Sequence, residues 1–344
     1  MIKKLPAKKV LNAGLKPEFI DGYSAFTKEA GRDFKILQLT DLHFGRGILS
    51  VGKDKLAHNA VVTLVERVKP DLIIITGDNI YPLPMFSGTI NNLRESKYVG
   101  NLMEQFGIPW TMTFGNHDTE PFATHSRREL LEYYSSLDNC LLTDGAPGVF
   151  GVGNHIIKVN NPDGELNTAL VMLDSNMYLG KTFFSTFDNI HDDQIEWYKE
   201  EMLKIGKGSI KPSLAFFHMP VKEYRDAWEK LKTGHTDEVT YHLGTIAEKN
   251  DHIGYSRRKE GRFFEEMVKF GSCKGMFCGH DHLNNISMTY KGIRLTYGMA
   301  IDYLAYIGIK KKYTNRGGTV ITIDDEGNFD VKLEPLTTPV EIYE

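Results

Sequence analysis

Apolar residues along the chain follow two alternating patterns. Short, nearly continuous apolar runs are typical of strands buried on both faces, and they occupy residues 72–76, 110–114, 170–173, 214–217 and 275–278. Between these runs, apolar residues recur at helical spacing over residues 54–68, 192–203 and 262–270. Strand-like and helix-like segments that alternate in this way predict an α/β protein whose sheets are covered by helices.

Further strands are expected towards both ends of the chain. Residues 24–28 and 34–40 look like two strands joined by a turn at 30–33. Near the C-terminus, 286–290 with 293–297 and 319–323 with 329–333 look like hairpins, because turn-forming residues separate the two members of each pair. The helix over 54–68 is expected to use Asp54 as the cap of its first turn and to stop before Pro70.

Composition changes this picture little. No linker, repeat or low-complexity segment divides the 344 residues, so we expect a single domain over 1–344. A hydrophobic content of 41% and a charged content of 25% are ordinary for a soluble globular enzyme. The formal net charge of −4 gives no reason to expect a nucleic-acid partner, which would normally face a basic surface or tail.

The cysteines and the start of the chain argue for an intracellular protein. Cys140, Cys273 and Cys278 match neither a disulfide framework nor a zinc knuckle, so we expect small buried apolar residues. The start, from Met1 to Pro6, is basic, but no apolar run long enough for a signal peptide follows it. No other segment reaches membrane-spanning length. We therefore expect a cytoplasmic location and no membrane partner.

Polar blocks follow directly after five of the expected strands. They contain Asp41 and His43, then Asp78, then Asn116, His117 and Asp118, then His218, and finally His280, Asp281 and His282. In open α/β sheets, ligands bind in the crevice outside the carboxyl ends of the strands, where loops from distant parts of the chain converge. Residues two apart in an extended segment point the same way, which holds for Asp41 with His43 and for His280 with His282.

The combination of these blocks predicts a metal centre. An Asp or Asn after a single strand is usually a turn former, and a lone His is usually a hydrogen-bonded polar residue. Turn formers have no reason to be His in four such places. Imidazole and carboxylate ligands without thiolate suit iron, manganese, zinc or cobalt, and the size of the set argues against a closed four-coordinate zinc site and against an all-oxygen calcium site.

The order of the blocks resembles the calcineurin-like metallophosphoesterase superfamily, whose pattern is D-x-H, G-D, G-N-H-D/E, a lone His and G-H-x-H. The resemblance runs from about residue 34 to 300, and the purple acid phosphatase-like branch is the most similar in general look. It implies an α/β fold of two packed mixed β-sheets flanked by helices. The catalytic core would then be about 34–300, and strands in about 301–335 would complete the sheets.

The resemblance also implies roles for individual residues. One ion would be held by Asp41, His43 and His282, the other by Asn116, His218 and His280, and the carboxylate of Asp78 would bridge the two. With two ions of iron, manganese or zinc, a hydroxide held between them would attack the phosphorus of a phosphomonoester or phosphodiester substrate.

Three neighbouring residues would assist without binding metal. His117 would face the substrate and donate a proton to the leaving oxygen or hold the developing charge, and Asp118 would orient its imidazole. Asp281 would orient a ligand from behind.

One departure concerns Tyr81. Purple acid phosphatases have Gly at the place of His43 and take a tyrosine ligand from a G-D-x-x-Y block, which this chain also has, ending in Tyr81. His43 and Tyr81 would compete for one coordination position. We expect His43 to bind, Tyr81 to line the pocket or pack, and the protein to be colourless.

Several features are left with two interpretations. Arg46 could contact a phosphate but is more simply a solvated loop residue, and Tyr303 and Tyr306 could stack on a leaving group or simply pack. The polar stretch 233–261 is either a lid over the site or a surface loop. For the whole protein, the alternative to an enzyme is a catalytically idle scaffold of the same fold, which would be expected to have lost ligands; none is missing here.

Overall fold

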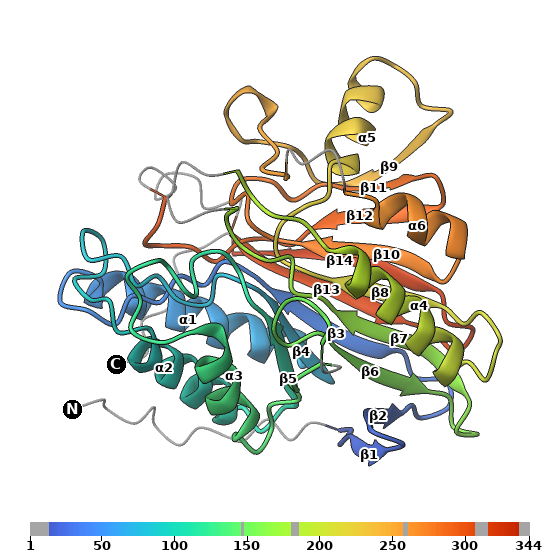
Figure 1. Cartoon of the computed structure of the whole chain (residues 1–344), viewed down its shortest axis with the longest axis horizontal. Helices are drawn as coiled ribbons and strands as arrows, with labels where there is room; N and C mark the ends of the chain where they lie inside the picture. The colour runs from blue at the N-terminus through green and yellow to red at the C-terminus, as the bar shows by residue number, and fades with distance from the viewer. Residues whose placement is uncertain (1–13, 146–147, 180–185, 257–260, 307–315, 337–344) are drawn as a thin grey trace.

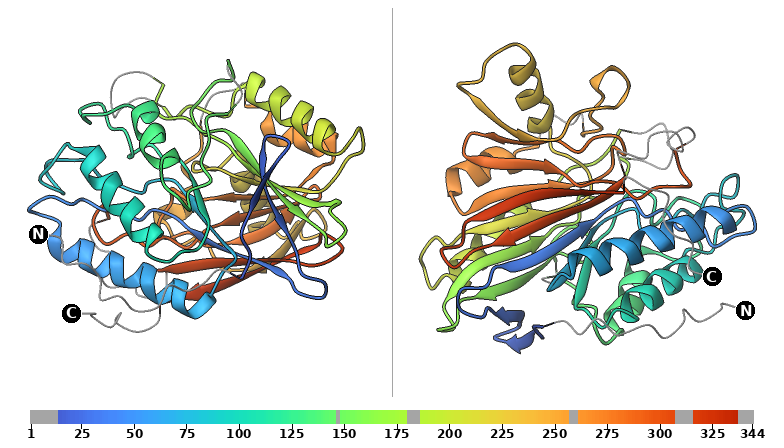
Figure 2. Two further views of the ribbon diagram at one scale, coloured as in Figure 1. Left: turned by 90° about the horizontal axis from the view of Figure 1, so that it is seen from below. Right: turned by 180° about the vertical axis from the view of Figure 1, so that it is seen from behind.

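Two β-sheets pack face to face, with helices on both outer sides (Figures 1 and 2). The computed structural model describes residues 14–145, 148–179, 186–256, 261–306 and 316–336. One sheet has nine strands in the order β1-β2-β6-β7-β8-β10-β12-β11-β9, and the other has five in the order β14-β13-β3-β4-β5. This architecture confirms the predicted fold of two packed mixed sheets flanked by helices.

The bounds of the elements are as follows. The five-stranded sheet contains β3 (Phe34–Leu39), β4 (Leu72–Thr76), β5 (Trp110–Thr113), β13 (Gly317–Ile323) and β14 (Phe329–Pro335). The nine-stranded sheet contains β1 (Glu18–Ile20), β2 (Tyr23–Thr27), β6 (His155–Asn160), β7 (Leu166–Met172), β8 (Ser213–Phe216), β9 (Val239–Leu243), β10 (Cys273–Cys278), β11 (Ser287–Tyr290) and β12 (Ile293–Tyr297). The helices are α1 (Val51–Val68), α2 (Asn92–Glu104), α3 (Arg127–Ser135), α4 (Asp192–Ile205), α5 (Glu223–Lys232) and α6 (Phe263–Phe270), with a short 3-10 turn η1 (Lys249–Asp251).

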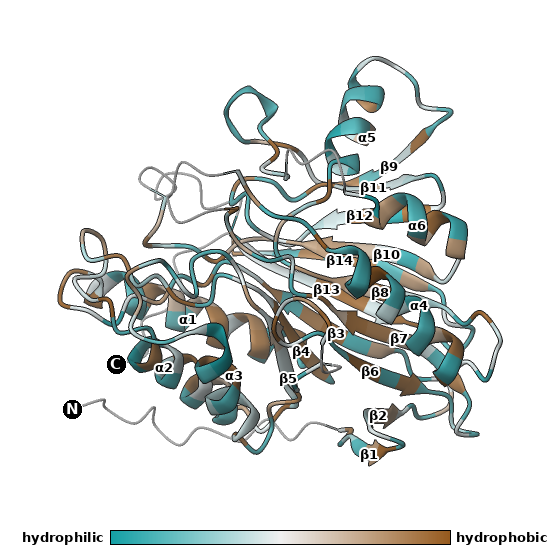
Figure 3. Ribbon diagram, in the orientation of Figure 1, coloured by the Kyte–Doolittle hydropathy of each residue, from teal (hydrophilic) through white to brown (hydrophobic). Residues whose placement is uncertain are grey.

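Three hydrophobic cores hold these layers together. The first lies between the five-stranded sheet and helices α1 to α3, and the second lies between the nine-stranded sheet and helices α4 to α6. The third lies between the sheets, where Ile36 and Ile74 of one sheet pack with Leu170 and Phe216 of the other. Figure 3 shows the same arrangement, because the strands in the middle of the molecule are mostly hydrophobic and the helices outside them are partly hydrophilic.

The parallel strands in the middle of each sheet bring their carboxyl ends to one edge. β3, β4 and β5 pair in parallel, and so do β7, β8, β10 and β12. The backbone links the two sheets at this edge, because Ile301 N donates to Thr40 O at 3.1 Å and Asp302 N donates to Asp41 O at 2.9 Å. Loops that follow strands of both sheets therefore meet at one place.

All of the predicted strands and helices are present, with two instructive differences. β11 with β12 and β13 with β14 are antiparallel hairpins, as predicted. The two strands predicted over 24–28 and 34–40 are both present but lie in different sheets, because β2 joins β6 in the larger sheet while β3 joins β4 and β13 in the smaller. Asp54 does not cap α1, whose N-cap is Ser50; its carboxylate instead accepts from the backbone N–H groups of Gly45 and Arg46.

The remaining sequence expectations concern single residues and the termini. Cys273 and Cys278 are buried as expected, Cys140 is half-buried, and all three are free thiols. Within the described ranges, no helix has the length and apolar character needed to cross a bilayer. The start from Met1 to Pro6 and Arg257 in the polar stretch 233–261 lie outside the described residues.

Candidate metal centre

The seven side chains predicted as metal ligands come together at the carboxyl ends of five strands. Asp41 and His43 follow β3, Asp78 follows β4 and Asn116 follows β5 in the smaller sheet, while His218 follows β8 and His280 and His282 follow β10 in the larger. Six of the seven are buried, and His280 is half-buried. The centre therefore lies at the seam between the two sheets.

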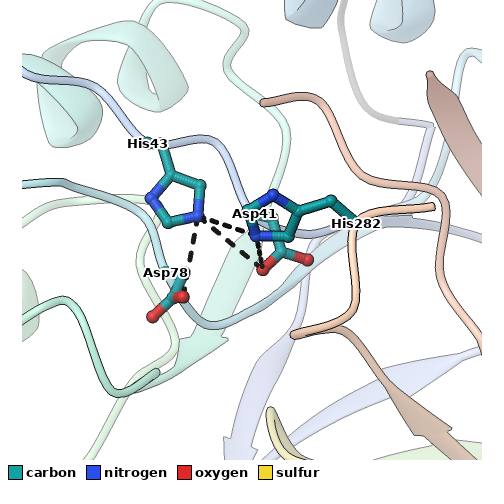
Figure 4. A group of neighbouring side chains, drawn as sticks. All are labelled: Asp41, His43, Asp78 and His282. Atoms are coloured by element: carbon teal, nitrogen blue, oxygen red, sulfur yellow. Dashed lines mark hydrogen bonds and ion pairs between the residues drawn. The ribbon is translucent and has the colours of Figure 1, made fainter. Parts of the chain in front are cut away.

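One group of ligand atoms belongs to Asp41, His43, Asp78 and His282, and these atoms all lie within 4.8 Å of one another. Figure 4 shows the His43 ring directed at the Asp78 carboxylate and at the His282 ring. The Nε2 atoms of His43 and His282 are 3.2 Å apart, and His282 Nε2 is 3.4 Å from Asp41 Oδ1. Two carboxylates and two imidazoles thus face one small volume.

A second group consists of Asp78, His218 and His280. His218 Nε2 lies 3.2 Å from Asp78 Oδ2 and 3.1 Å from Asn116 Oδ1, so the asparagine amide belongs to the same group. The two groups share Asp78. Its buried Oδ2 accepts no hydrogen bond within the described part of the chain. A buried anionic oxygen without a hydrogen bond, facing imidazole nitrogens from both groups, fits a position between two cations.

Residues behind the ligands hold the donor atoms towards the centre. His282 Nδ1 is 3.0 Å from Asp302 Oδ2, and His218 Nδ1 is 2.9 Å from Thr76 O, so both rings turn Nε2 inward. Asn116 Nδ2 donates to the Tyr178 hydroxyl at 2.9 Å, which leaves the amide oxygen directed at His218. Asp302 and Tyr178 were missed in the sequence, although Asp302 also follows a strand, β12.

The backbone around the ligands explains the glycines in the motifs. Asp41, His43, Asp78 and His280 have φ values of 53°, 47°, 51° and 77°, a left-handed conformation that side chains rarely adopt. A Cβ at Gly115 would lie 2.1 Å from Asp78 Oδ1, and one at Gly279 would lie 1.9 Å from Thr40 Oγ1. Only glycine lets these loops approach the ligands so closely.

Burial and neighbouring charges divide the ligand imidazoles into two kinds. Burial lowers the pKa of His43 to about 4 and that of His280 to about 3, so both imidazoles are neutral at neutral pH. Burial alone would raise the pKa of Asp78, but His218 and His117 hold it well below its usual value. Asp78 is therefore anionic. Against the effect of burial, Asp78 raises the pKa of His218 to about 9, and Asp41 and Asp302 raise that of His282 well above its usual value, so these two imidazoles must release a proton when cations bind.

His117 lies at the edge of the centre and has an unexpected partner. Its Nε2 is 4.0 Å from Asp78 Oδ2, and its Nδ1 is hydrogen-bonded to the buried carboxylate of Glu120. Burial alone would lower the pKa of His117, but Asp78 and the Glu120 hydrogen bond raise it overall. His117 thus keeps a proton more readily than an ordinary histidine.

Asp118 does not take the orienting position that the sequence suggested. Its Oδ1 accepts from Asn79 N at 2.9 Å and its Oδ2 accepts from Gly115 N at 2.7 Å, so it ties the loop after β4 to the loop after β5. Glu120, three positions after His117, orients the imidazole in place of Asp118. A side chain at that spacing can turn back to the ring. The sequence signal for this role is Glu120, three residues after His117.

Asp281 also differs from expectation. Its Oδ2 accepts from Gly254 N at 2.8 Å and from the Tyr297 hydroxyl at 2.6 Å, and no contact with a ligand imidazole is found for it among the described residues. It fastens the segment around Gly254, where a Cβ would lie 2.7 Å from the His280 ring. Its effect on the ligand is therefore through packing.

Tyr81 packs, as expected. Its buried ring lies edge-on to His43, with centroids 4.9 Å apart, and edge-on to His117, with centroids 4.8 Å apart.

Arg46, Tyr303 and Tyr306, for which the sequence allowed either a substrate contact or a bland role, mostly pack against other side chains. The Arg46 guanidinium lies 4.0 Å from the centre of the Tyr98 ring, so it is not a freely solvated loop residue. Tyr303 is buried, whereas Tyr306 is 41% exposed, lies 5.5 Å from the His282 ring and donates to Glu248 at 2.7 Å. Within 233–261 the structure has β9 and η1, so part of this stretch is an edge strand of the larger sheet.

Comparisons with known proteins agree on one family. The profile of the family described as "Calcineurin-like phosphoesterase" matches residues 34–284. A protein described as "Probable inactive purple acid phosphatase 28" of Arabidopsis thaliana is 30% identical over 308 residues, which cover 79% of this chain and 71% of that protein. The "Phosphatase DCR2" of Saccharomyces cerevisiae is 32% identical over 292 residues, covering 77% of this chain and 47% of that protein.

A solved structure shows the same fold. The dimetal phosphatase from Danio rerio superposes with a TM-score of 0.54 at 14% identity, and the match covers 90% of this chain and 98% of that chain. At this identity the likeness concerns the arrangement of sheets and helices.

Proposed function

The chain belongs to the calcineurin-like phosphoesterase family, and we propose that it hydrolyses phosphate esters at a centre of two metal ions. The observation that carries the proposal is the pair of ligand groups that share Asp78. A structural site would need only one such group. Two groups with a common carboxylate are the arrangement that holds two cations a few ångströms apart.

In this proposal, one ion is held by Asp41, His43, Asp78 and His282, and the other by Asp78, Asn116, His218 and His280. The ligands suit iron, manganese or zinc. When bound, such ions neutralise phosphate oxygens and make a water acidic enough to attack phosphorus at neutral pH. The whole chain would act as one catalytic domain, with residues 34–300 supplying the ligands.

His117 would act on the leaving group. The Glu120 hydrogen bond at Nδ1 fixes the ring so that Nε2 points to the centre, 4.0 Å from Asp78 Oδ2. A proton on Nε2 can then pass to the oxygen that leaves phosphorus, or the cationic ring can stabilise the charge that develops there. The substrate would be a phosphomonoester or a phosphodiester, because both place a leaving oxygen at this position.

The alternative is a catalytically idle protein with the same fold. The description of the Arabidopsis thaliana relative as probably inactive favours it, while the description of the Saccharomyces cerevisiae relative as a phosphatase favours an enzyme. The complete ligand set and the His117–Glu120 pair support the enzyme here, since a binding scaffold has no need of either.

The test is a parallel assay of metal content and hydrolysis. Protein loaded with iron, manganese or zinc is assayed on an aryl phosphate and on a bis-aryl phosphate, beside Asp78→Asn. We expect two ions per chain and hydrolysis of at least one ester type, with both lost in Asp78→Asn. Two bound ions without hydrolysis of either ester would favour the scaffold, and fewer than two ions would contradict the centre itself.

A further inference from the structure

A cluster of exposed apolar side chains lies at one end of the molecule. It is formed by the loop before α1 with the first residue of that helix, and by the loop between β4 and α2. Ile48, Leu49, Val51, Met85 and Ile90 are 85%, 56%, 63%, 87% and 39% exposed, and we call these five residues the apolar tip. Figure 3 shows hydrophobic colouring on these loops where they extend beyond the helices. Large apolar residues gathered in this way mark a binding surface.

The two loops of the apolar tip are packed against each other. Leu49 N donates to Ser87 O at 3.2 Å, and a Cβ at Gly88 would lie 3.1 Å from Ile48 Cγ1. Ser50 N and Asp54 N, which bond within the turn that starts α1, brace the first loop further. The exposed side chains therefore stand on a fixed backbone.

The charges around the apolar tip have one sign. Within 45–56 and 82–98 the exposed or half-exposed charged residues are Arg46, Lys53, Lys55, Arg94 and Lys97. The acidic residues of these segments, Asp54 and Glu95, are 2% and 0% exposed. This basic collar stands out in a chain whose formal net charge is −4. Lys55, Arg94 and Lys97 are exposed and Lys53 is half-exposed, and no ion pair is found for these four among the described residues.

The apolar tip is close to the candidate metal centre. Phe86, beside Met85, packs on Tyr81 with ring centroids 5.6 Å apart, and Tyr81 in turn contacts His43 and His117. The loop of Met85 is therefore connected through two ring contacts to His117, whose side chain is 21% exposed.

We propose that the apolar tip and its basic collar dock on an anionic lipid surface. Protruding aliphatic side chains can enter the boundary between headgroups and acyl chains, while lysine and arginine side chains around them attract anionic headgroups. A protein partner would not require a collar of one sign, whereas an anionic membrane does. This docking is reversible surface binding and needs no membrane-spanning segment.

The test is sedimentation of the whole protein with vesicles of phosphatidylcholine, with or without phosphatidylserine. We expect binding that requires phosphatidylserine and weakens in high salt. The variant Ile48→Ser/Met85→Ser should lower affinity by at least about tenfold, because it removes the apolar part. Lys55→Gln/Arg94→Gln should lower it by about tenfold or more, because each charge contributes separately.

Matched controls come from the far end of the molecule, in the loop after α4 (Figure 1). Ile210→Ser changes an aliphatic residue that is 48% exposed, and Lys207→Gln changes an exposed lysine; both should bind like the wild type. Thermal unfolding of every variant shows whether the fold is intact.

Three results would overturn the proposal. Equal sedimentation with and without phosphatidylserine would exclude anionic recognition. Tip variants that bind like the controls would exclude the tip. Self-association that disappears in Ile48→Ser/Met85→Ser, without vesicle binding, would assign the surface to a second copy of the chain. None of these readouts depends on hydrolysis, so the proposed function is tested separately.

Discussion

Glu120 lies three residues after His117 and is hydrogen-bonded to Nδ1 of its imidazole. This bond keeps the other ring nitrogen, Nε2, turned to the candidate metal centre. Glu120 is 2% exposed, so this carboxylate is committed to the histidine and not to solvent. The pair places a proton-bearing ring beside the metal ligands without making it one of them.

Glu120→Gln should therefore weaken hydrolysis in a way that depends on the leaving group. The amide cannot stabilise a cationic ring, so we expect kcat to fall by about 10- to 100-fold for phenyl phosphate and less for 4-nitrophenyl phosphate, whose leaving oxygen needs less protonation. His117→Ala should show the same trend more strongly. Glu120→Asp serves as the conservative comparison. Equal losses for the two esters in Glu120→Gln would assign Glu120 a purely structural role.

Asp302→Asn should lower metal affinity more than it lowers the stability of the fold. Its Oδ2 is bonded to His282 Nδ1, and outer partners of this kind typically contribute 10- to 100-fold in metal affinity. We expect about that loss at one of the two ions, measured by titration with a chelator. Its Oδ1 also accepts from the backbone N–H groups of Leu304 and Ala305, so thermal unfolding of the metal-free variant must be measured alongside. An unchanged chelator titration would refute the role.

Gly115→Ala and Gly52→Ala make the same substitution at a crowded glycine and at a glycine with open space around it. The added Cβ at Gly115 would collide with Asp78 Oδ1, which should cost about 1–3 kcal/mol of stability and lower metal content. Gly52 lies in the first turn of α1, and a Cβ there would meet nothing within 4 Å. Gly52→Ala should therefore stabilise the protein by up to about 1 kcal/mol. Urea unfolding and metal analysis of both variants check the contrast; similar behaviour would contradict it.

The iron-loaded protein should be colourless in the region where tyrosinate bound to iron absorbs. His43 belongs to a ligand group and the Tyr81 ring packs edge-on against it, so we expect the imidazole and not the phenol to take that coordination position. Tyr81→Phe should leave the visible spectrum unchanged. A visible band that vanishes in Tyr81→Phe would show that Tyr81 coordinates iron.

The candidate site was more predictable than the residues that support it. Asp41, Asp78 and His218 each follow a short buried apolar run, and strand ends converge in any parallel sheet, so sequence pattern was enough to group them. Asp302 supports His282 from a different loop, which only the folded chain brings near. Glu120 and Asp118 are both near His117 in sequence, and either could have been its carboxylate partner. The conformation of the loop places Glu120 at the imidazole and Asp118 at backbone N–H groups.

The fold was predictable where periodicity was strong and less so elsewhere. Helices α2, α3 and α5 were not predicted. Of these, α3 carried a usable signal, because Ser126 and Glu129 form a capping box with the spacing that precedes many helices. β9 was hidden in the polar stretch 233–261, since an edge strand with exposed side chains lacks the apolar alternation of a half-buried one. The assignment of β2 and β3 to different sheets depends on pairings between residues far apart in sequence.

The position of the candidate centre at the seam has a thermodynamic consequence. Asp41, Asp78 and Asn116 are carried by one sheet, and His218, His280 and His282 by the other. Any sliding of one sheet past the other would pull the two halves of the coordination sphere apart. Cations bound there would connect the two sheets. Because they would bind the folded state and not the unfolded chain, metal binding would stabilise the packing of the sheets against each other.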